Sequence, residues 1–191
     1  MKLEFMNISN AQVVILSPST RLVPYGPALV PLVNACIDAF VHAGARKFVV
    51  QEKPNQDNEI IETLSKNPLD PGKVNIIYLR ASAREIFSQY EQALSKEMII
   101  LDGCFLIIAG GMKMPKNSIL SANGGILPVA AVQKELVVDA NNDIHASLFS
   151  ALRGKDKVSV SEVNPKRVFD FGDKNAAKSE LRLWRWAARV R

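Results

Sequence analysis

Cysteine and histidine are scarce in this chain of 191 residues, which contains two of each. Two isolated cysteines, Cys36 and Cys104, can form neither a disulfide framework nor the four-ligand set of a structural zinc site. We therefore expect both to be buried, reduced thiols. Neither His42 nor His145 lies near a serine and a carboxylate in a catalytic pattern. We expect structural roles for both, with His42 near the carbonyl end of a helix.

Long apolar runs are also missing. No stretch approaches the roughly 18 apolar residues that a membrane-spanning helix needs. The longest candidate, residues 98–109, is interrupted by Asp102 and Gly103. Residues 1–10 lack the apolar core flanked by basic residues that a signal peptide has. We therefore expect no membrane partner and a cytoplasmic location.

The overall composition is that of an ordinary globular protein, with 48% apolar and 23% charged residues. A chain of this length can bury a core of its own without a disulfide or a metal. The net charge is +5, and an acidic partner is possible where the cations gather. They gather in the C-terminal part: Lys166, Arg167, Lys174, Lys178, Arg182, Arg185, Arg189 and Arg191.

The first half of the chain alternates strand and helix patterns. Apolar, β-branched residues predict a buried strand at Gln12–Leu16, and three prolines and a glycine predict a loop at residues 17–27. Apolar residues at steps of three and four predict an amphipathic helix over residues 29–41, ending before Gly44. A strand follows at residues 47–51. Such a strand–helix–strand unit joins parallel strands with a right-handed crossover.

The alternation continues to residue 101 and then stops. Helices are predicted at residues 57–66 and 82–95, and strands at residues 74–79 and 98–101. After that, glycine, proline and asparagine separate strand-like segments, which predicts a mixed or antiparallel half over residues 102–191. We expect one three-layer, Rossmann-like α/β domain with a mostly parallel central sheet, spanning residues 1–191. In the second half, strands are expected at residues 105–109, 126–132, 135–139, 157–160 and 168–171, and helices at residues 144–152 and 176–190.

Two loops stand where open α/β sheets bind ligands, at the carboxyl ends of strands. The first contains Ser17, Ser19, Thr20 and Arg21, whose hydroxyls, backbone amides and guanidinium are phosphate-binding groups. It is neither a Walker loop nor a GxGxxG loop. Asp102 ends the fourth strand, where a carboxylate can hold Mg²⁺ against a bound phosphate. The alternatives are a proline-stiffened connection and a turn aspartate that bonds to its own backbone.

Two stretches resemble the sugar-phosphate nucleotidyltransferases. That family opens with an apolar strand, a loop ending in Thr-Arg-Leu, a Pro-Lys-Leu segment and a helix ending in Ala-Gly. Residues 13–50 match it at Thr20-Arg21-Leu22, Pro24, Leu32-Val33 and Ala43-Gly44, and residues 97–107 resemble its strand that ends in a metal-binding aspartate. The resemblance implies a GT-A, Rossmann-like fold. It also implies Mg²⁺-dependent transfer of a nucleotidyl group from a nucleoside triphosphate to a sugar phosphate, with release of pyrophosphate.

The resemblance also implies roles for individual residues. Arg21 and Asp102 would be catalytic, and Asp102 would share a magnesium ion with a late aspartate, Asp173 or Asp170. The nucleotide would be bound by Ser17, Ser19, Thr20 and Arg21. The chain departs from the family in its short Ser17-Pro18-Ser19 loop and in Ala28, which stands near the family's lysine. A second hypothesis is therefore a catalytically silent scaffold or assembly subunit with the same fold.

Two further segments have open interpretations. The expected C-terminal helix has cations on one side, which can bind nucleic acid, an anionic membrane surface, or a partner that is another protein or a second copy. The alternative is a helix packed through Leu181 and Trp184 with its basic face in solvent. No RNA-binding signature accompanies it, so we do not expect nucleic acid as the main partner. Glycine pairs flank Lys113 and Lys116, which predicts either a surface loop or a lid over an anionic ligand.

Overall fold

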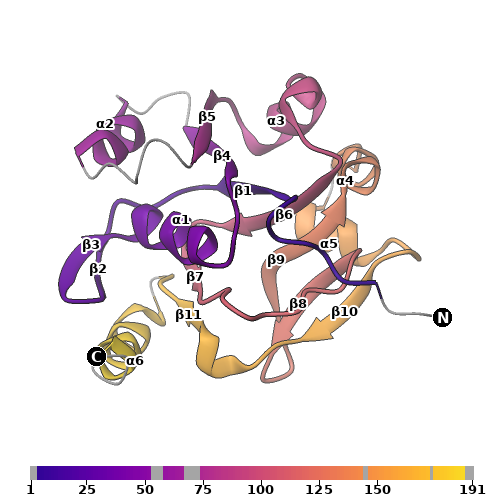
Figure 1. The fold of residues 1–191 in the computed structure, drawn as a ribbon. Helices are drawn as coiled ribbons and strands as arrows, with labels where there is room; N and C mark the ends of the chain where they lie inside the picture. Colours follow the sequence, from indigo (N-terminus) through magenta and orange to yellow (C-terminus); the bar gives the residue numbers. More distant parts are fainter. Residues whose placement is uncertain (1–3, 53–57, 67–73, 144–145, 173, 188–191) are drawn as a thin grey trace.

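A mostly parallel sheet forms the centre of the computed structural model, which describes residues 4–52, 58–66, 74–143, 146–172 and 174–187. The seven strands lie in the order β10-β8-β9-β6-β1-β4-β5 (Figure 1). β9 runs antiparallel to its neighbours β6 and β8, and the other pairings in this sheet are parallel. The strands are β1 (Gln12–Leu16), β4 (Lys47–Glu52), β5 (Asn75–Arg80), β6 (Glu97–Asp102), β8 (Ser118–Ala122), β9 (Gly125–Gln133) and β10 (Ser159–Glu162).

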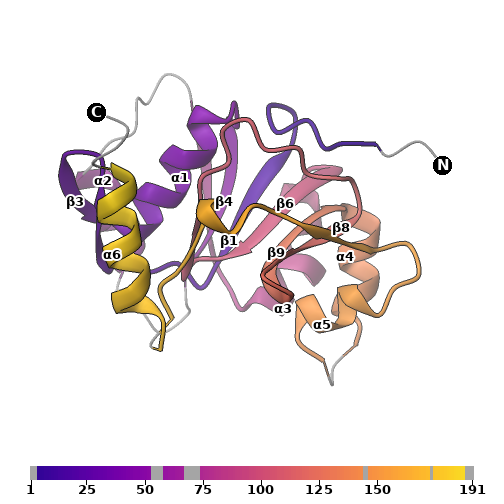
Figure 2. The same cartoon turned by 90° about the horizontal axis from the view of Figure 1, so that it is seen from below.

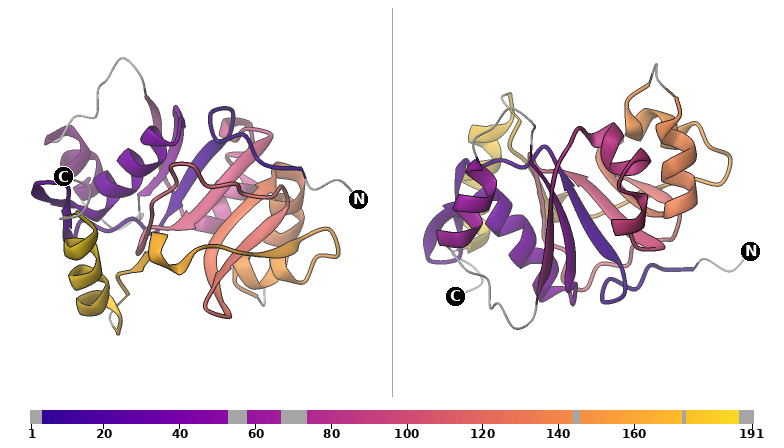
Figure 3. Two further views of the ribbon diagram at one scale, coloured as in Figure 1. Left: turned by 60° about the horizontal axis from the view of Figure 1, so that its bottom comes forward. Right: turned by 90° about the horizontal axis from the view of Figure 1, so that it is seen from above.

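Helices cover both faces of this sheet, so the predicted three-layer α/β architecture is confirmed (Figure 3). One face carries α1 (Leu32–His42), α2 (Glu59–Lys66) and α6 (Ala176–Ala187). The other carries α3 (Ala83–Ser88), α4 (Lys134–Asn141) and α5 (Leu148–Arg153). The 3₁₀ turns are η1 (Glu91–Ala93) and η2 (Pro165–Arg167). None of the described helices is long and apolar enough to cross a membrane.

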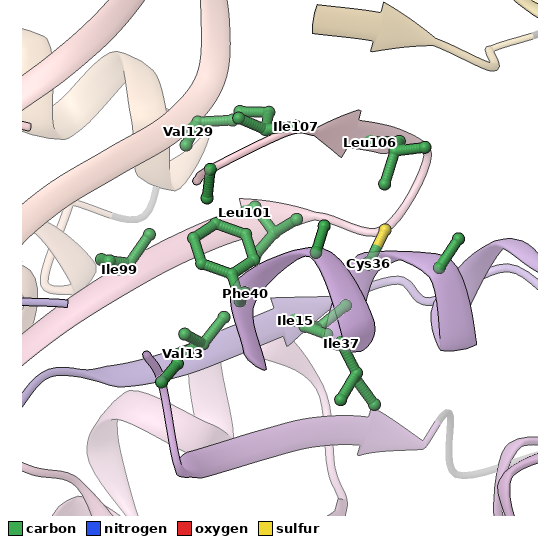
Figure 4. Packing of buried hydrophobic residues seen from close by; sticks show 14 of the residues in the cluster. Val13, Ile15, Cys36, Ile37, Phe40, Ile99, Leu101, Leu106, Ile107 and Val129 are labelled. Carbon is green, nitrogen blue, oxygen red and sulfur yellow. The ribbon is translucent and has the colours of Figure 1, made fainter. Parts of the chain in front are cut away.

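The unit of β1, α1 and β4 forms as its apolar pattern predicts, except that α1 begins at Leu32 and residues 28–31 form a strand. Val13 and Ile15 of β1 face Phe40 of α1, and Ile99 and Leu101 of β6 complete this part of the core (Figure 4). All five side chains are fully buried. Each such burial stabilises the fold by about 1.5–3 kcal/mol. The core therefore keeps β1 and β6 in register, and the register decides what meets at their carboxyl ends.

The segment predicted as a loop after β1 is partly a hairpin. β2 (Leu22–Tyr25) and β3 (Ala28–Pro31) pair antiparallel before α1 begins. Gly26 at the tip has a φ of +63°, which glycine adopts without steric cost. The prolines that indicate a loop are tolerated here because a two-stranded ribbon consists only of edge strands.

Residues 135–139, predicted as a strand, belong to helix α4. The run Leu136-Val137-Val138 is rich in β-branched residues, which favours a strand. In the structure, however, Val137 and Ala140 are buried at helical spacing against the sheet, and packing overrides the local preference. Strand β8 was not predicted, and the helix expected over residues 82–95 ends at Ser88 and is followed by η1.

Two short strands and α6 complete the face that α1 occupies. β7 (Phe105–Ile107) pairs antiparallel with β11 (Val168–Asp170), and α6 packs on β2 and β11 (Figure 2). The buried side chains of α6 are Ala176, Ser179 and Leu183. The prediction that it packs through Leu181 and Trp184 is wrong, because these side chains are 54% and 46% exposed.

Candidate functional site

The carboxyl ends of β1 and β6 meet at one edge of the sheet. Leu16 and Asp102 are partners in the parallel register, and the Gly103 N–H donates to the Leu16 carbonyl at 2.6 Å. A Cβ atom on Gly103 would lie 2.5 Å from the Cα of Pro18, so glycine is required for this approach. The loop after β1 and the turn after β6 therefore pack backbone against backbone.

Asp102 has the backbone contact of a turn aspartate. Its Oδ1 accepts the N–H of Cys104 at 2.9 Å, and the side chain is half-buried. The carbonyl of Cys104 in turn accepts the N–H of Phe171 at 2.8 Å, and Asp170 pairs with Phe105 across β7 and β11. A second carboxylate thus comes to the same turn from the far end of the chain.

Asp102 and Asp170 offer hard oxygen ligands. Asp170 accepts the Gly172 N–H at 2.8 Å through Oδ1 and the Asn175 amide at 2.6 Å through Oδ2. The described residues contain no cluster of three or more His, Cys, Asp or Glu side chains that could hold a metal. Mg²⁺ is usually held by one or two carboxylates together with substrate phosphates, so each of these side chains is of a suitable ligand type. The predicted ligand Asp173 lies outside the described residues.

Arg21 does not reach Asp102. Its Nη2 lies 3.9 Å from Oε2 of Glu180 on α6, and both side chains are exposed. Arg21 and Asp102 form no ion pair with each other in the described structure, although their loops are in contact through Gly103. The neighbouring Thr20 donates to Oε1 of Glu59 at 2.5 Å, which ties this loop to the start of α2.

The loop after β1 is held by a side chain that sequence reasoning missed. Ser17 has a φ of +46°, and its N–H donates to Oε1 of Gln51 at 2.7 Å. Gln51 is 5% exposed and donates through Nε2 to the carbonyl of Ala81 at 2.8 Å. One amide therefore links the ends of β1, β4 and β5. In the sequence, this role is indicated by the two polar residues, Gln51 and Glu52, that end the apolar run of β4.

Glu52, the other member of that pair, is a buried carboxylate at the same edge. Its side chain is 1% exposed, and Oε2 lies 3.4 Å from Nη2 of Arg80, which also donates to Asn58. Oε1 has no hydrogen-bond partner among the described residues. Burial first, and the Glu52 charge second, raise the pKa of Tyr78. Glu52 can therefore accept a further donor at the edge where ligands bind.

A hollow of about 350 Å³ opens beside Asp170, between the β8–β9 hairpin, β11 and α6. Lys178 and Arg182 supply positive charge to its wall, and Asn123 and Asn175 supply amides. The volume falls within the range of small-molecule sites. The hollow can therefore take an anionic ligand next to one of the two carboxylates.

The lysines of the glycine-flanked segment lie at the opposite edge of the sheet. Nζ of Lys116 is 2.8 Å from Oε1 of Glu97, which begins β6, and 3.6 Å from Oε2 of Glu4. Lys113 stacks on the ring of Phe5 with its Nζ 5.8 Å from the centroid. Asp102 ends β6, so these lysines do not cover it. The interpretation as a lid is wrong.

The contacts of Cys36 and His42 are structural. Cys36 is buried and donates to the carbonyl of Phe105 at 3.3 Å, and burial raises the pKa of its thiol. Cys104 is half-buried rather than buried as expected, and it forms no disulfide. His42 contacts the carbonyl of Asp38 through Nδ1 at 2.9 Å, as expected near a helix end. His145 lies outside the described residues.

We expect the Gln51→Ala protein to lose both stability and ligand affinity. Truncation of the Gln51 side chain leaves the Ser17 N–H and the Ala81 carbonyl without their partner, which lowers the free energy of unfolding by about 2 kcal/mol. Gln12 is a matched control, because it joins the Ala93 carbonyl (3.1 Å) and the Ser95 N–H (2.8 Å) at the amino end of β1. The Tm of thermal unfolding should fall by a similar amount in Gln51→Ala and Gln12→Ala, but only Gln51→Ala should weaken the binding of an anionic ligand to the loop after β1. Equal affinities in the two variants would contradict a positioning role for Gln51.

No protein-family model and no curated protein sequence matches this chain, but solved structures do. The 4-diphosphocytidyl-2C-methyl-D-erythritol synthase of Anaerococcus prevotii is similar at a TM-score of 0.59 and 12% identity, over 93% of this chain and 97% of that one. A Bacillus anthracis protein described as a glucose-1-phosphate thymidylyltransferase is similar at a TM-score of 0.65 and 7% identity, over 91% and 94%. A Mycobacterium sp. strain JC1 homologue of Rv0371c is similar at 0.61 and 16%, over 96% and 99%.

These similarities extend over nearly the whole length of each chain, including the mixed second half. The identities of 7–16% are low, so what is shared is the arrangement of strands and helices. The expectation drawn from the strand-and-loop resemblance is confirmed at that level. This chain has the fold of the sugar-phosphate nucleotidyltransferases.

Proposed function

We propose that this protein binds a nucleoside triphosphate at the carboxyl edge of its sheet and transfers the nucleotidyl group to a sugar phosphate. The observation that supports this most directly is the position of Asp102. It ends β6 beside the end of β1, and its turn packs on the loop that contains Ser17 and Pro18. An anionic ligand on that loop would lie next to the carboxylate and any cation it holds.

The loop after β1 would bind the phosphates. Ser17, Ser19 and Thr20 offer hydroxyls and backbone amides, and Arg21 offers a guanidinium. The contact between Arg21 and Glu180 is long, at 3.9 Å, and exposed, so it contributes little to stability. A phosphate group can therefore replace Glu180 as the partner of Arg21.

Asp102 and Asp170 would hold Mg²⁺, with Asp173 as an adjoining candidate ligand. When bound, the ion neutralises phosphate charge that develops during transfer. The Cys104 N–H holds one oxygen of Asp102, which keeps the carboxylate oriented. Because Asn175 and Gly172 hold Asp170 in the same manner, both ligands are positioned before the nucleotide arrives.

The sugar phosphate would occupy the hollow beside Asp170. Lys178 and Arg182 line this hollow and can bind the phosphate of the acceptor. A phosphate oxygen of the acceptor attacks the α-phosphorus of the nucleotide and forms a new P–O bond. The bond between the α- and β-phosphates breaks, and pyrophosphate leaves with the electron pair.

The test is to incubate the protein with each nucleoside triphosphate, Mg²⁺ and a panel of sugar phosphates, and to measure pyrophosphate. We expect release of pyrophosphate that requires both the acceptor and Mg²⁺. We also expect the protein to act in the cytoplasm. Reactions without acceptor are the control. Absence of pyrophosphate with every pair, together with no thermal shift from any nucleotide, would contradict the proposal.

A second candidate function is a catalytically silent assembly subunit. Ala28 is exposed on β3, near the position of the family's lysine, and α6 presents Leu181 and Trp184 to solvent. These side chains could join two copies or a protein partner. Light scattering of the native protein and of a Leu181→Ser, Trp184→Ser variant tests association through this face. A native protein that is monomeric, like the variant, would argue against self-association.

A further inference from the structure

A second hollow lies along α6, and no residue of the loops after β1 and β6 lines it. It has a volume of about 230 Å³ and is lined by Lys166, Phe169, Arg182, Arg185 and Trp186, and we call it the basic hollow. It shares Arg182 with the larger hollow, but Asp170 does not line it. The proposed transfer reaction therefore leaves it without an assigned role.

Among the described residues, the cations of the basic hollow have no acidic partner. Lys166, Arg182 and Arg185 form no ion pair within the part of the chain that the structure describes. No acidic side chain of those residues lines the hollow. Because like charges repel, a site with three cations gains most from a ligand that brings negative charge.

One of the three cations is already held in place. Arg182 donates through Nη2 to the carbonyl of Pro165 at 2.6 Å, and its guanidinium lies 5.2 Å from the ring centroid of Phe169. A guanidinium held in this way loses little conformational entropy when it binds an anion. The hollow is thus a prepared site around a fixed cation.

The basic hollow also has an aromatic wall. Trp186 is half-buried and packs against the core with part of its indole in the hollow. Phe169 is 1% exposed and has Arg182 on its face, so Trp186 is the ring available for stacking. The volume is below the roughly 300 Å³ at which drug-sized sites begin, so the occupant is a small unit.

We propose that the basic hollow binds a nucleoside monophosphate unit. Its phosphate lies beside the fixed guanidinium of Arg182 and pairs with Lys166 and Arg185. Its base stacks on Trp186, since base–aromatic stacking is effective for every base. A free mononucleotide and the end of a single strand present this same unit. The inference does not depend on the proposed transfer reaction, because Lys166, Arg185 and Trp186 have no role in that reaction.

Fluorescence of Trp186 tests the proposal. The chain has two tryptophans, so Trp184→Phe leaves Trp186 as the only one. We expect AMP to quench this protein with an affinity at least about tenfold greater than that of adenosine or inorganic phosphate, because each of these lacks one of the two contacts. No quenching by millimolar AMP, or adenosine as effective as AMP, would overturn it.

Variants locate the site. Lys166→Gln and Arg185→Gln should each weaken AMP binding by roughly tenfold, the loss expected for a charge-assisted contact. Lys157→Gln, an exposed cation on the connection before β10, should leave it unchanged, as should Asp102→Asn at the carboxyl edge. Equal weakening in the Lys157→Gln control would overturn the proposal. A 5′-phosphorylated single-stranded oligonucleotide that binds more tightly than AMP would assign the site to a strand end, and equal affinity would assign it to a free nucleotide.

Discussion

Replacement of Asp102 by asparagine should lower kcat/KM for nucleotidyl transfer by about a thousandfold or more, because the charge that would hold Mg²⁺ is lost. The fold should survive. An asparagine carbonyl can still accept the Cys104 N–H, which lies 2.9 Å from Oδ1 of Asp102. Pyrophosphate release at saturating Mg²⁺ measures the first effect. Thermal unfolding measures the second, and we expect a change in Tm of no more than about 2 °C, within the usual range for an isosteric change.

Two further variants interpret that result. Asp170→Asn should reduce the activity in the same direction, since Asp170 reaches the same turn through β11. Asp156→Asn, at an exposed position between α5 and β10, should have no effect. An Asp102→Asn protein that retains its activity would leave Asp102 with its turn contact alone. The proposed role of Asp102 would then be wrong, whereas a native protein without any transfer activity would favour the assembly-subunit hypothesis.

Replacement of Gly103 by alanine should have the largest effect on stability. A Cβ at this position would lie 2.5 Å from the Cα of Pro18 and 2.9 Å from the carbonyl oxygen of Ser17. Both are backbone atoms, so no rotation of a side chain can relieve the overlap. We expect a loss of about 3 kcal/mol, at the upper end for overpacking. In a domain of this size that lowers Tm by about 6–12 °C.

Gly110→Ala is the matched control for this prediction. A Cβ on Gly110 meets no atom within 4 Å, and Gly110 is not among the glycines with positive φ. Its Tm should stay within about 1 °C of the native value. Thermal unfolding of the two variants side by side separates the close contact at Gly103 from the general effect of adding a methyl group. Equal Tm values would show that the two loops do not pack as described.

Local patterns were enough to predict the β1–α1–β4 unit in the first half of the fold. The apolar stripe of α1 and the β-branched runs of β1 and β4 agree with their final burial, so local preference and tertiary packing favour the same structure. The same patterns put Asp102 at the end of a strand. Adjacent parallel strands have their carboxyl ends at one edge, so the approach of β1 and β6 could be expected from strand order.

Other features depend on contacts between distant parts of the chain. Residues 135–139 have a strand-like composition, but α4 forms because the sheet offers it an apolar face. The bridge made by Gln51 joins Ser17 and Ala81, which are far apart in sequence, and no periodicity predicts such a pair. Which side chains of α6 are buried and which are exposed likewise depends on where β2 and β11 lie.

By itself, the sequence determined the α/β class, the β1–α1–β4 unit and the positions along the chain of Asp102 and of the loop after β1. These follow from short-range apolar periodicity and from glycine and proline, which act within a few residues. Only the tertiary structure decided that Asp170 reaches the turn of Asp102, that Arg21 lies against Glu180, and that Leu181 and Trp184 face solvent. Those outcomes depend on which surfaces meet when the helices and short strands pack on the sheet, and that is a property of the whole chain.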